Sequence, residues 1–320
     1  MNKNFFLCGK IIILLLCALL STSLSAQFVE PKFDVITPVI VPACVFQDSY
    51  GFIWIGDQAG LVKYDGYNLK RYSQIPFDST SLSNNWVMTI KEDKKGNLWI
   101  GTQGGGLDYF DQRTETFTCF LQDKNDSRSA GMNTILKILV NDDGSLWLGT
   151  QDQGLVYIRI DSIGNAIYNN YDLNIVPNPT VPTGDNTVSD LYKDKQGKIW
   201  IGTNGGGLKL FDPLTEAITH FRHDPNNPNS ISSNIVNSIC EDDSGNLWIG
   251  TGYGLNKFDL NKGQFIHYNH NPEDPTSLCS NYITSLVIDK ESILWIGTSA
   301  NYVNSISIAD LLSDKNSHFH

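Results

Sequence analysis

The feature that most constrains this chain is a triplet of tryptophan, an aliphatic residue and glycine, which recurs six times. Successive tryptophans are 45 to 53 residues apart, and only Trp86 of the 7 tryptophans lies outside a triplet. Repetition at a period of this length indicates that one supersecondary unit is copied along the chain. The six repeated tryptophans are Trp54, Trp99, Trp147, Trp200, Trp248 and Trp295.

Each repeat also carries turn-forming residues ahead of its tryptophan. The residue six positions earlier is Asp48, Asp93, Asn141, Asp194, Asp242 or Asp289. The residue three positions earlier is Gly51, Gly96, Gly144, Gly197 or Gly245, with Ser292 in the last unit. Asp and Asn side chains bond the local backbone in turns, and glycine accepts a positive φ there. We therefore predict a tight hairpin before every Trp strand.

The Trp strand itself, written "NLWIG" or "SLWLG", is a short apolar run without polar alternation, which is typical of a strand buried on both faces. A Gly-rich loop, a strand such as "GLDYFD", an aromatic segment such as "FTCF" and a polar stretch follow. Four short strands per unit and almost no helical periodicity predict an all-β fold, a β-propeller of four-stranded antiparallel blades. The glycine two residues after each tryptophan indicates strand curvature or close contact between blades. Six repeats fit either a closed six-bladed ring or an incomplete seven-bladed one.

The N-terminus reads as a secretory signal peptide over residues 1–26. Lys3 and Lys10 flank the start, "IIILLLCALL" is too short to span a bilayer comfortably, and "STSLSAQ" supplies small residues before a cleavage site near Ala26. The propeller then occupies residues 27–320, and "PKFDVITPVIVP" could add an outer strand that closes the ring. We expect a periplasmic or secreted protein with no membrane span after cleavage.

Charge and cysteine content narrow the classes of partner. The net charge is −11 and no basic run occurs, which argues against nucleic acid or an anionic membrane as a partner. Cys44, Cys119, Cys240 and Cys279 remain after the signal peptide, widely spaced and without a CxxC motif, so no zinc site is expected. Whether they form disulfides is left open.

Candidate ligand-binding residues lie in the loop after the Trp strand. If the strands of a blade are ordered outward from the axis, this loop and the loop that leads to the next blade share one face. The first loop carries an amide four residues after the tryptophan in four units, and Gly252 and Ser299 break the series. Such amides could hydrogen-bond sugar hydroxyls, or each could cap its own loop. The four amides are Gln58, Gln103, Gln151 and Asn204.

Trp86 and Tyr282 stand at equivalent places in "SNNWV" and "SNYI". An aromatic side chain there could stack on a sugar ring or pack between two blades. Trp86 therefore joins the four amides as a candidate ligand contact.

Other chemistry-bearing patterns have simpler explanations. The pairs His220/His223 and His267/His270 have i, i+3 spacing, which places two strand residues on opposite faces and does not suit a metal site. The "GGG" runs lack the Lys-Ser/Thr of a phosphate loop. "EDDSGN" fails the spacing of an EF-hand and suits a hairpin turn. No catalytic residues, metal or cofactor are predicted.

The repeats resemble the two-component regulator propeller family, whose hallmark is the string G-x-L/I-W-I/L-G-T-x-x-G-G-L-x-x-F/Y-D. The resemblance covers Val45 to Thr298 and recurs in register in six units. It implies the exported sensor region of a hybrid two-component system. Full-length members of that family carry paired seven-bladed propellers, a β-sandwich, one membrane helix, a histidine kinase, a receiver and a DNA-binding region. Their inputs are commonly oligosaccharides.

The chain departs from that family in ways that shape the functional hypothesis. After Thr298 the sixth unit lacks the Gly-Leu pair and the aromatic-Asp ending, and no kinase or receiver motif occurs. We expect a non-enzymatic, ligand-sensing propeller, an input region or fragment, that binds an oligosaccharide or a second propeller or sensor domain. The alternatives are a propeller enzyme that acts on a polysaccharide or lactone and a protein–protein interaction scaffold. The sequence does not name the ligand.

Overall fold

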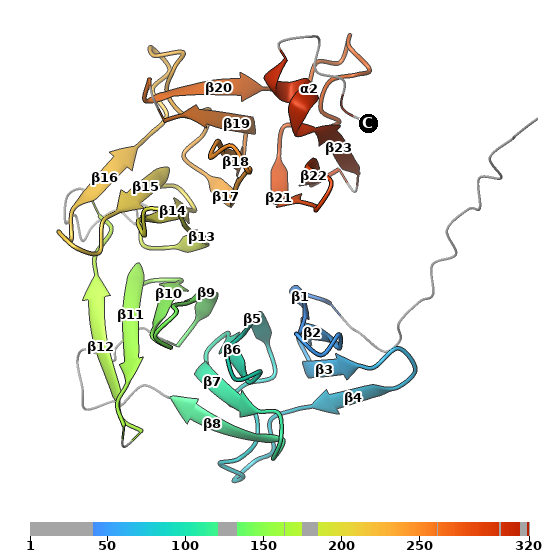
Figure 1. Ribbon diagram of the computed structural model, residues 1–320, viewed down its shortest axis with the longest axis vertical. Helices are drawn as coiled ribbons and strands as arrows, with labels where there is room; N and C mark the ends of the chain where they lie inside the picture. Colours follow the sequence, from blue (N-terminus) through green and yellow to red (C-terminus); the bar gives the residue numbers. More distant parts are fainter. Residues whose placement is uncertain are drawn as a thin grey trace, which may run out of the picture. The chain divides into compact units, whose positions relative to one another are not determined.

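The computed structural model describes residues 41–120, 133–162, 164–174, 185–260, 262–300, 302–313 and 319. These residues form six antiparallel sheets that follow one another around an axis (Figure 1). Five sheets have four strands and the sixth has three. The predicted all-β propeller with six blades is therefore confirmed.

The strands of each blade are consecutive in the chain, and each pairs with the next. Blade 1 contains β1 (Cys44–Gln47), β2 (Ile53–Asp57), β3 (Gly60–Tyr64) and β4 (Leu69–Tyr72). Blade 2 contains β5 (Val87–Glu92), β6 (Leu98–Thr102), β7 (Gly106–Asp111) and β8 (Thr116–Phe120). Blade 3 contains β9 (Ile135–Val140), β10 (Leu146–Thr150), β11 (Leu155–Ile160) and β12 (Ala166–Tyr171). Blade 4 contains β13 (Val188–Lys193), β14 (Ile199–Thr203), β15 (Leu208–Phe211) and β16 (Ile218–Phe221). Blade 5 contains β17 (Val236–Glu241), β18 (Leu247–Thr251), β19 (Gly254–Asp259) and β20 (Gln264–Tyr268). Blade 6 contains β21 (Ile283–Ile288), β22 (Ile293–Thr298) and β23 (Val303–Ser307).

The predicted hairpin turns precede the Trp strands and are built as the sequence indicates. In blade 5, Asp242 Oδ1 accepts hydrogen bonds from the N–H groups of Ser244 and Asn246, at 3.0 and 2.9 Å. The equivalent pair of bonds forms at Asp48, Asp93, Asp194 and Asp289. Gly245 has a φ of 85°, and Ser292 adopts a φ of 59° at the same place in blade 6. The aspartate thus closes the turn, and the glycine supplies the left-handed residue that the turn needs.

The core consists of five hydrophobic clusters, one between each pair of consecutive blades. Every position of β6, β10, β14 and β18 is buried, so the Trp strand is covered on both faces as predicted. At Gly250 a Cβ atom would lie 2.6 Å from Ile283 Cγ2 of the next blade. At Gly202 the same atom would lie 2.8 Å from Val236 Cγ1. The glycine after the tryptophan is therefore required by close contact between blades.

The innermost strands β1, β5, β9, β13, β17 and β21 contact one another in that order and lie nearest the axis in Figure 1. No comparable contact joins β21 to β1 within the described part of the chain. Among the described residues, the six blades therefore form a ring without a contact of this kind between its first and last blades.

The blade faces at the two ends of this series carry exposed apolar side chains. On blade 6, Trp295 is 43% exposed, with Val287 and Val303 exposed beside it, whereas the equivalent Trp248 of blade 5 is fully buried. On blade 1, Val45 is 65% exposed. These are the faces that elsewhere in the ring pack against a neighbouring blade.

The sixth blade ends differently from the others. After β23 the chain enters the short helix α2 (Ile308–Leu312), whose Ile308 and Leu311 are buried against blade 5 and blade 6 residues. Phe319 is also buried, and its N–H donates to the carbonyl of Thr276 at 2.8 Å. The N–H of Phe265 in β20 makes the same bond to Asn229. Phe319 therefore fills the place of a fourth-strand aromatic residue.

Several sequence predictions fall outside what the structure describes. The predicted signal peptide, residues 1–26, lies outside the described residues, as does most of the segment 31–42. Within the described residues, no helix has the length and apolar character needed to cross a membrane. The thiols of Cys44, Cys119, Cys240 and Cys279 are free.

Candidate functional site

Each candidate residue of the loop after the Trp strand is the residue that directly follows that strand in the chain. Because the Trp strand starts at the hairpin turn in every blade, these residues lie together on the opposite face of the propeller. We call this face the amide face, and the face with the hairpin turns the turn face. The six positions are Gln58 after β2, Gln103 after β6, Gln151 after β10, Asn204 after β14, Gly252 after β18 and Ser299 after β22.

Backbone hydrogen bonds join each of these loops to the start of the innermost strand in blades 2 to 6. The N–H of the loop residue donates to the carbonyl just before that strand, over 2.9 to 3.1 Å. The predicted proximity of the two loops is therefore confirmed in these blades. The bonds run from Gln103 to Trp86, Gln151 to Thr134, Asn204 to Thr187, Gly252 to Ile235 and Ser299 to Tyr282.

The loop after the Trp strand is closed by the threonine that ends the strand. Thr203 Oγ1 donates to the carbonyl of Gly207 at 2.7 Å, and Thr150 Oγ1 donates to that of Gly154 at 3.0 Å. Thr102, Thr251 and Thr298 make the equivalent bonds. Sequence reasoning missed this role, although the threonine recurs beside the Trp-aliphatic-Gly triplet in five units.

The side-chain amides of the four candidate residues, three of which follow such a threonine and one of which follows Asp57, are free. Among the described residues, no hydrogen-bond partner is found for the side chains of Gln58, Gln103, Gln151 or Asn204. Gln58, Gln151 and Asn204 are exposed, and Gln103 is half-buried. None of the four amides therefore caps its own loop among the described residues; a threonine does so in blades 2 to 4, and Asp57 bonds the N–H of Ala59 in blade 1.

The two aromatic residues of the inter-blade loops are partly exposed on the same face. Trp86 is 38% exposed and Tyr282 is 41% exposed. The backbone N–H of Trp86 donates to Asn84 Oδ1 at 2.9 Å, and the Trp86 carbonyl accepts from the backbone N–H of Gln103. Trp86 thus lies next to one of the four free amides, whereas Tyr282 lies next to Ser299.

Asparagines fix the loops that lead from one blade to the next. Asn234 Oδ1 accepts from the N–H of His223 at 2.8 Å, and the Asn234 carbonyl accepts from Gly207 at 2.8 Å. Asn281 and His270 repeat the first bond at 2.7 Å. In blade 4 these bonds join the segments that contain Gly207, His223 and Asn234, so they fix the backbone of the loops on the amide face.

A buried charged cluster lies behind the amide face in blade 4. Lys209 and Asp185 are fully or almost fully buried and 2.7 Å apart, and Arg222 Nη2 donates to both Asp185 oxygens at 2.7 Å. Lys209 Nζ also lies 3.1 Å from His220 Nδ1, which accepts from it. Burial, and then the charge of Lys209, lower the pKa of His220. Sequence reasoning missed this cluster, because Lys209 and Asp185 are 24 residues apart.

The equivalent position in blade 2 holds a carboxylate without a cation. Asp108 is fully buried, and its Oδ2 accepts from the hydroxyl and N–H of Ser83 at 2.6 and 3.2 Å. Its Oδ1 has no partner. Burial raises the pKa of Asp108 to about 6. In blade 1, Asp57 is bound by both terminal nitrogens of Arg71, at 2.7 and 2.9 Å.

The histidine pairs hold loops in place. His223 Nδ1 donates to the carbonyl of Ile231 at 2.9 Å, and His267 Nε2 donates to that of Ser230 at 2.7 Å. His270 Nδ1 bonds the carbonyl of Leu278 in the same way as His223. In the described ranges, no group of three or more His, Cys, Asp and Glu side chains could hold a metal ion.

Comparison with known families finds a match to the repeats that the sequence shows. Residues 81–104, 184–205, 230–253 and 277–300 match the profile of the two component regulator propeller. These segments contain the inter-blade loops of blades 2, 4, 5 and 6 and extend to the amide-face positions, including Gln103 and Asn204. No curated protein matches the chain.

Similar solved structures include two extracellular domains assigned to hybrid two-component systems of B. thetaiotaomicron. The first is 26% identical, with a TM-score of 0.70, over 88% of this chain and 35% of that one. The second is 24% identical, with a TM-score of 0.57, over 86% of this chain and 39% of that one. Virginiamycin B lyase from Staphylococcus aureus is 12% identical, with a TM-score of 0.62, over 91% of this chain and 87% of that one. The lyase shares the fold alone.

Proposed function

We propose that this chain, whose repeats are two component regulator propeller repeats, is an exported sensor propeller that binds a neutral oligosaccharide on its amide face. The observation that carries the proposal is the set of four free side-chain amides, Gln58, Gln103, Gln151 and Asn204, spread over four blades on one face.

The similar extracellular domains support the sensor part of the proposal. This chain spans about a third of the length of the first of them, so their other parts have no counterpart in it. Signal output would therefore belong to other domains or to a partner, such as a second propeller or sensor domain. Export is proposed from the signal-peptide pattern of residues 1–26 and agrees with relatives that are extracellular.

The chemistry of the amide face suits a neutral ligand. A primary amide both donates and accepts hydrogen bonds, as a sugar hydroxyl does. The net charge of −11 disfavours anionic polymers. Trp86, 38% exposed beside Gln103, offers an aromatic surface for a sugar ring. Amides on several blades suit an extended chain of sugars better than a single small molecule.

A non-catalytic role is proposed because three acidic groups near this face, Asp57, Asp108 and Asp185, are buried, and two of them are paired with cations. Asp185 is bound by Lys209 and Arg222, and Asp57 is bound by Arg71. Asp108 is fully buried. A glycosidase needs two carboxyl groups that flank the scissile bond, one of them able to give up a proton.

Calorimetric titration of the purified chain with neutral oligosaccharides tests this proposal. We expect the double substitution Gln103→Ala with Asn204→Ala to raise the Kd at least tenfold, because two donor–acceptor groups are lost. Gln264→Ala is the matched control, since Gln264 is an exposed amide on the outer strand β20.

Three results would contradict the proposal. No binding of any neutral oligosaccharide at millimolar concentration would overturn the ligand class. An equal loss of affinity in Gln264→Ala would overturn the location. Hydrolysis of the oligosaccharide by the purified chain would overturn the non-catalytic role.

A further inference from the structure

Blades 2 and 3 differ from the other four blades in how they treat the N–H of the repeated tryptophan. In four blades this indole N–H donates to the aspartate six residues earlier, over 2.7 to 3.1 Å. The pairs are Trp54–Asp48, Trp200–Asp194, Trp248–Asp242 and Trp295–Asp289. The aspartate thus serves both the turn and the tryptophan.

Blade 2 uses the same aspartate for a different donor. The hydroxyl of Tyr109, which lies against Trp99 with ring centroids 4.6 Å apart, donates to Asp93 Oδ2 at 3.1 Å. Asn97 Nδ2 donates to the same hydroxyl at 2.7 Å. The tyrosine of blade 2 therefore has an acceptor, whereas Trp99 Nε1 makes no hydrogen bond over the described segments.

In blade 3 neither donor has an acceptor. Tyr157 lies against Trp147 as in blade 2, with ring centroids 4.8 Å apart, but the acidic residue is replaced by Asn141. Asn141 Oδ1 accepts from Lys193 Nζ at 3.0 Å, and its Nδ2 donates to Ser145 Oγ at 3.0 Å. Over the described segments, Trp147 Nε1 and the Tyr157 hydroxyl make no hydrogen bond.

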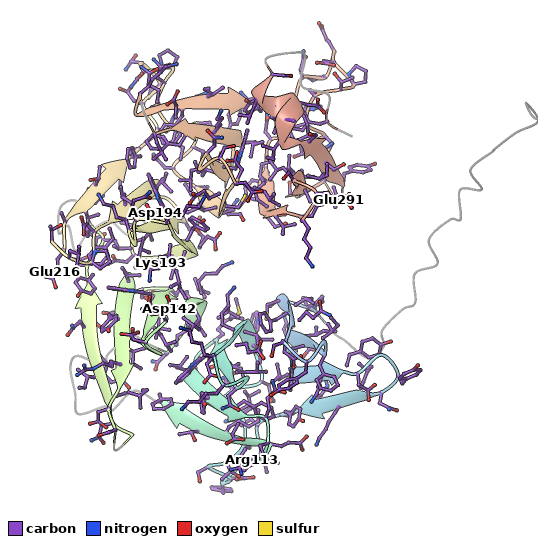
Figure 2. All side chains as sticks on the ribbon, viewed as in Figure 1. Arg113, Asp142, Lys193, Asp194, Glu216 and Glu291 are labelled. Atoms are coloured by element: carbon purple, nitrogen blue, oxygen red, sulfur yellow. The ribbon has the colours of Figure 1, made fainter. Side chains whose placement is uncertain are left out.

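These two donors line a pocket between blades 3 and 4 on the turn face, with a volume of 440 Å³. Figure 2 labels two further lining residues, Asp142 of blade 3 and Lys193 of blade 4, which lie close to each other across the blade boundary. Gln196 and Leu214 also contribute. The volume falls within the usual range of small-molecule sites, about 300–1,000 Å³.

The free indole N–H is open to this pocket. Trp147 is only 6% exposed, yet its nitrogen is not sealed from solvent. Among the described side chains, the sealed and unpartnered atoms are Asp108 Oδ1 and Arg222 Nε. A ligand that supplies an acceptor can therefore replace solvent at this nitrogen.

The remaining polar groups of the pocket leave an excess of donors. Asp142 is paired with Lys94 at 2.8 Å, and Asp143 Oδ1 accepts from the hydroxyl of Ser145 at 2.6 Å. Asp212 Oδ2 lies 3.7 Å from Lys198 Nζ, and its Oδ1 accepts from a backbone N–H. Each of these carboxylates thus has at least one engaged oxygen, and an indole, a phenol and part of an ammonium group remain available as donors.

We propose that this pocket binds a small molecule of about one sugar residue in size through its oxygen acceptors, either a carboxylate or neighbouring hydroxyl groups. Trp147 Nε1 and the Tyr157 hydroxyl donate to the acceptor, and the Lys193 ammonium flanks it. The site lies on the opposite face from the oligosaccharide surface proposed above and does not depend on it.

The test follows the indole ¹H–¹⁵N signals of the 7 tryptophans while sodium D-glucuronate or D-glucose is added to the purified chain. These probes differ only in a carboxylate or a CH₂OH group at one carbon. We expect the Trp147 signal, assigned with Trp147→Phe, to shift in a saturable way. The signals of Trp200 and Trp248, whose N–H groups are bonded to aspartates, stay in place.

Asn141→Asp is the decisive variant, because it restores an acceptor that takes the indole N–H in four blades and the tyrosine hydroxyl in blade 2. We expect the affinity for the active probe to fall at least tenfold. Asn226→Asp adds the same charge at an exposed loop position and serves as the matched control. The indole spectrum of each variant reports whether it is folded.

The outcomes separate the two acceptor types and can overturn the proposal. A response to glucuronate alone supports carboxylate recognition, and a response to both probes supports hydroxyl recognition. An unmoved Trp147 signal with both probes at millimolar concentration, or unchanged binding in Asn141→Asp, contradicts the site. Binding lost in the Gln103→Ala, Asn204→Ala variant instead would place the ligand on the amide face.

Discussion

The exposure of Trp295 in blade 6 predicts that two equivalent tryptophans contribute differently to stability. Trp248 of blade 5 is fully buried, whereas Trp295 of blade 6 is 43% exposed. Each donates its indole N–H to its own aspartate, at 3.0 and 2.7 Å. Replacing each by alanine therefore removes a similar hydrogen bond and differs mainly in buried apolar surface.

The expected magnitudes follow from this burial. Truncation of a fully buried tryptophan to alanine costs about 3–5 kcal/mol. Trp295 buries little more than half of its surface, so its loss should cost about 2 kcal/mol on the same scale. The two variants should thus differ by about 2 kcal/mol in the free energy of unfolding. Differences of this kind are more reliable than absolute sums of buried area.

Urea unfolding followed by far-UV circular dichroism measures both variants against the parent chain. The midpoint should fall much further for Trp248→Ala than for Trp295→Ala, with similar dependence on urea concentration. Equal shifts would refute the reasoning, because they would mean that the Trp295 face of blade 6 is covered in solution. A lower slope in one variant alone would show instead that the unfolding transition has lost its cooperativity.

Two further stability predictions concern a buried carboxylate and the chain end. Burial raises the pKa of Asp108 to about 6, above its unfolded value of 3.8, so the parent loses stability as the pH rises between these values. Asp108→Asn, which copies Asn256 of blade 5, should therefore stabilise the protein by about 1–2 kcal/mol at pH 7.5 and by much less at pH 3.5. Urea midpoints at both pH values measure this, and an equal gain at both would contradict the assignment. Phe319→Ala should cost about 3 kcal/mol, because Phe319 is buried beside Tyr268 with ring centroids 6.3 Å apart. An unchanged thermal midpoint would show that the chain end does not stabilise blade 6.

Most of the fold could be predicted because the repeated residues make contacts that recur from blade to blade. In blades 1 to 5 the glycine two residues after the tryptophan meets an inner-strand residue of the next blade, as Gly250 meets Ile283. The aspartate of the turn bonds two backbone N–H groups, as Asp242 does. Such requirements are local or recur at a fixed period, so they leave a pattern in the sequence.

The end of the ring could not be predicted in the same way. Phe319 takes the place of a fourth-strand aromatic residue, because its ring packs beside Tyr268 in the cluster between blades 5 and 6. The sequence around it reads as a tail with no repeat signature. Likewise, no local pattern distinguishes the exposed Trp295 from its five buried counterparts, since exposure depends on what lies beyond the blade.

The candidate sites were predictable only where they follow the repeat. The amides were found because they stand at a fixed distance from each tryptophan, and three of them follow threonines that already close the loops. The cluster of Lys209, Asp185 and Arg222 was missed, since its members come from three segments that only the folded blade brings together.

Departures from the repeat are therefore the best guide to function in a chain of this kind. A residue that every blade shares is accounted for by packing, and its loss harms the fold whatever the ligand. Asn141 replaces an aspartate that could have been kept without cost to the turn, and the replacement leaves two aromatic donors unpaired in a pocket. Blade 3 thus leaves its tyrosine hydroxyl as well as its indole N–H without a protein acceptor among the described residues, and a ligand that supplies an acceptor on the turn face would bond them.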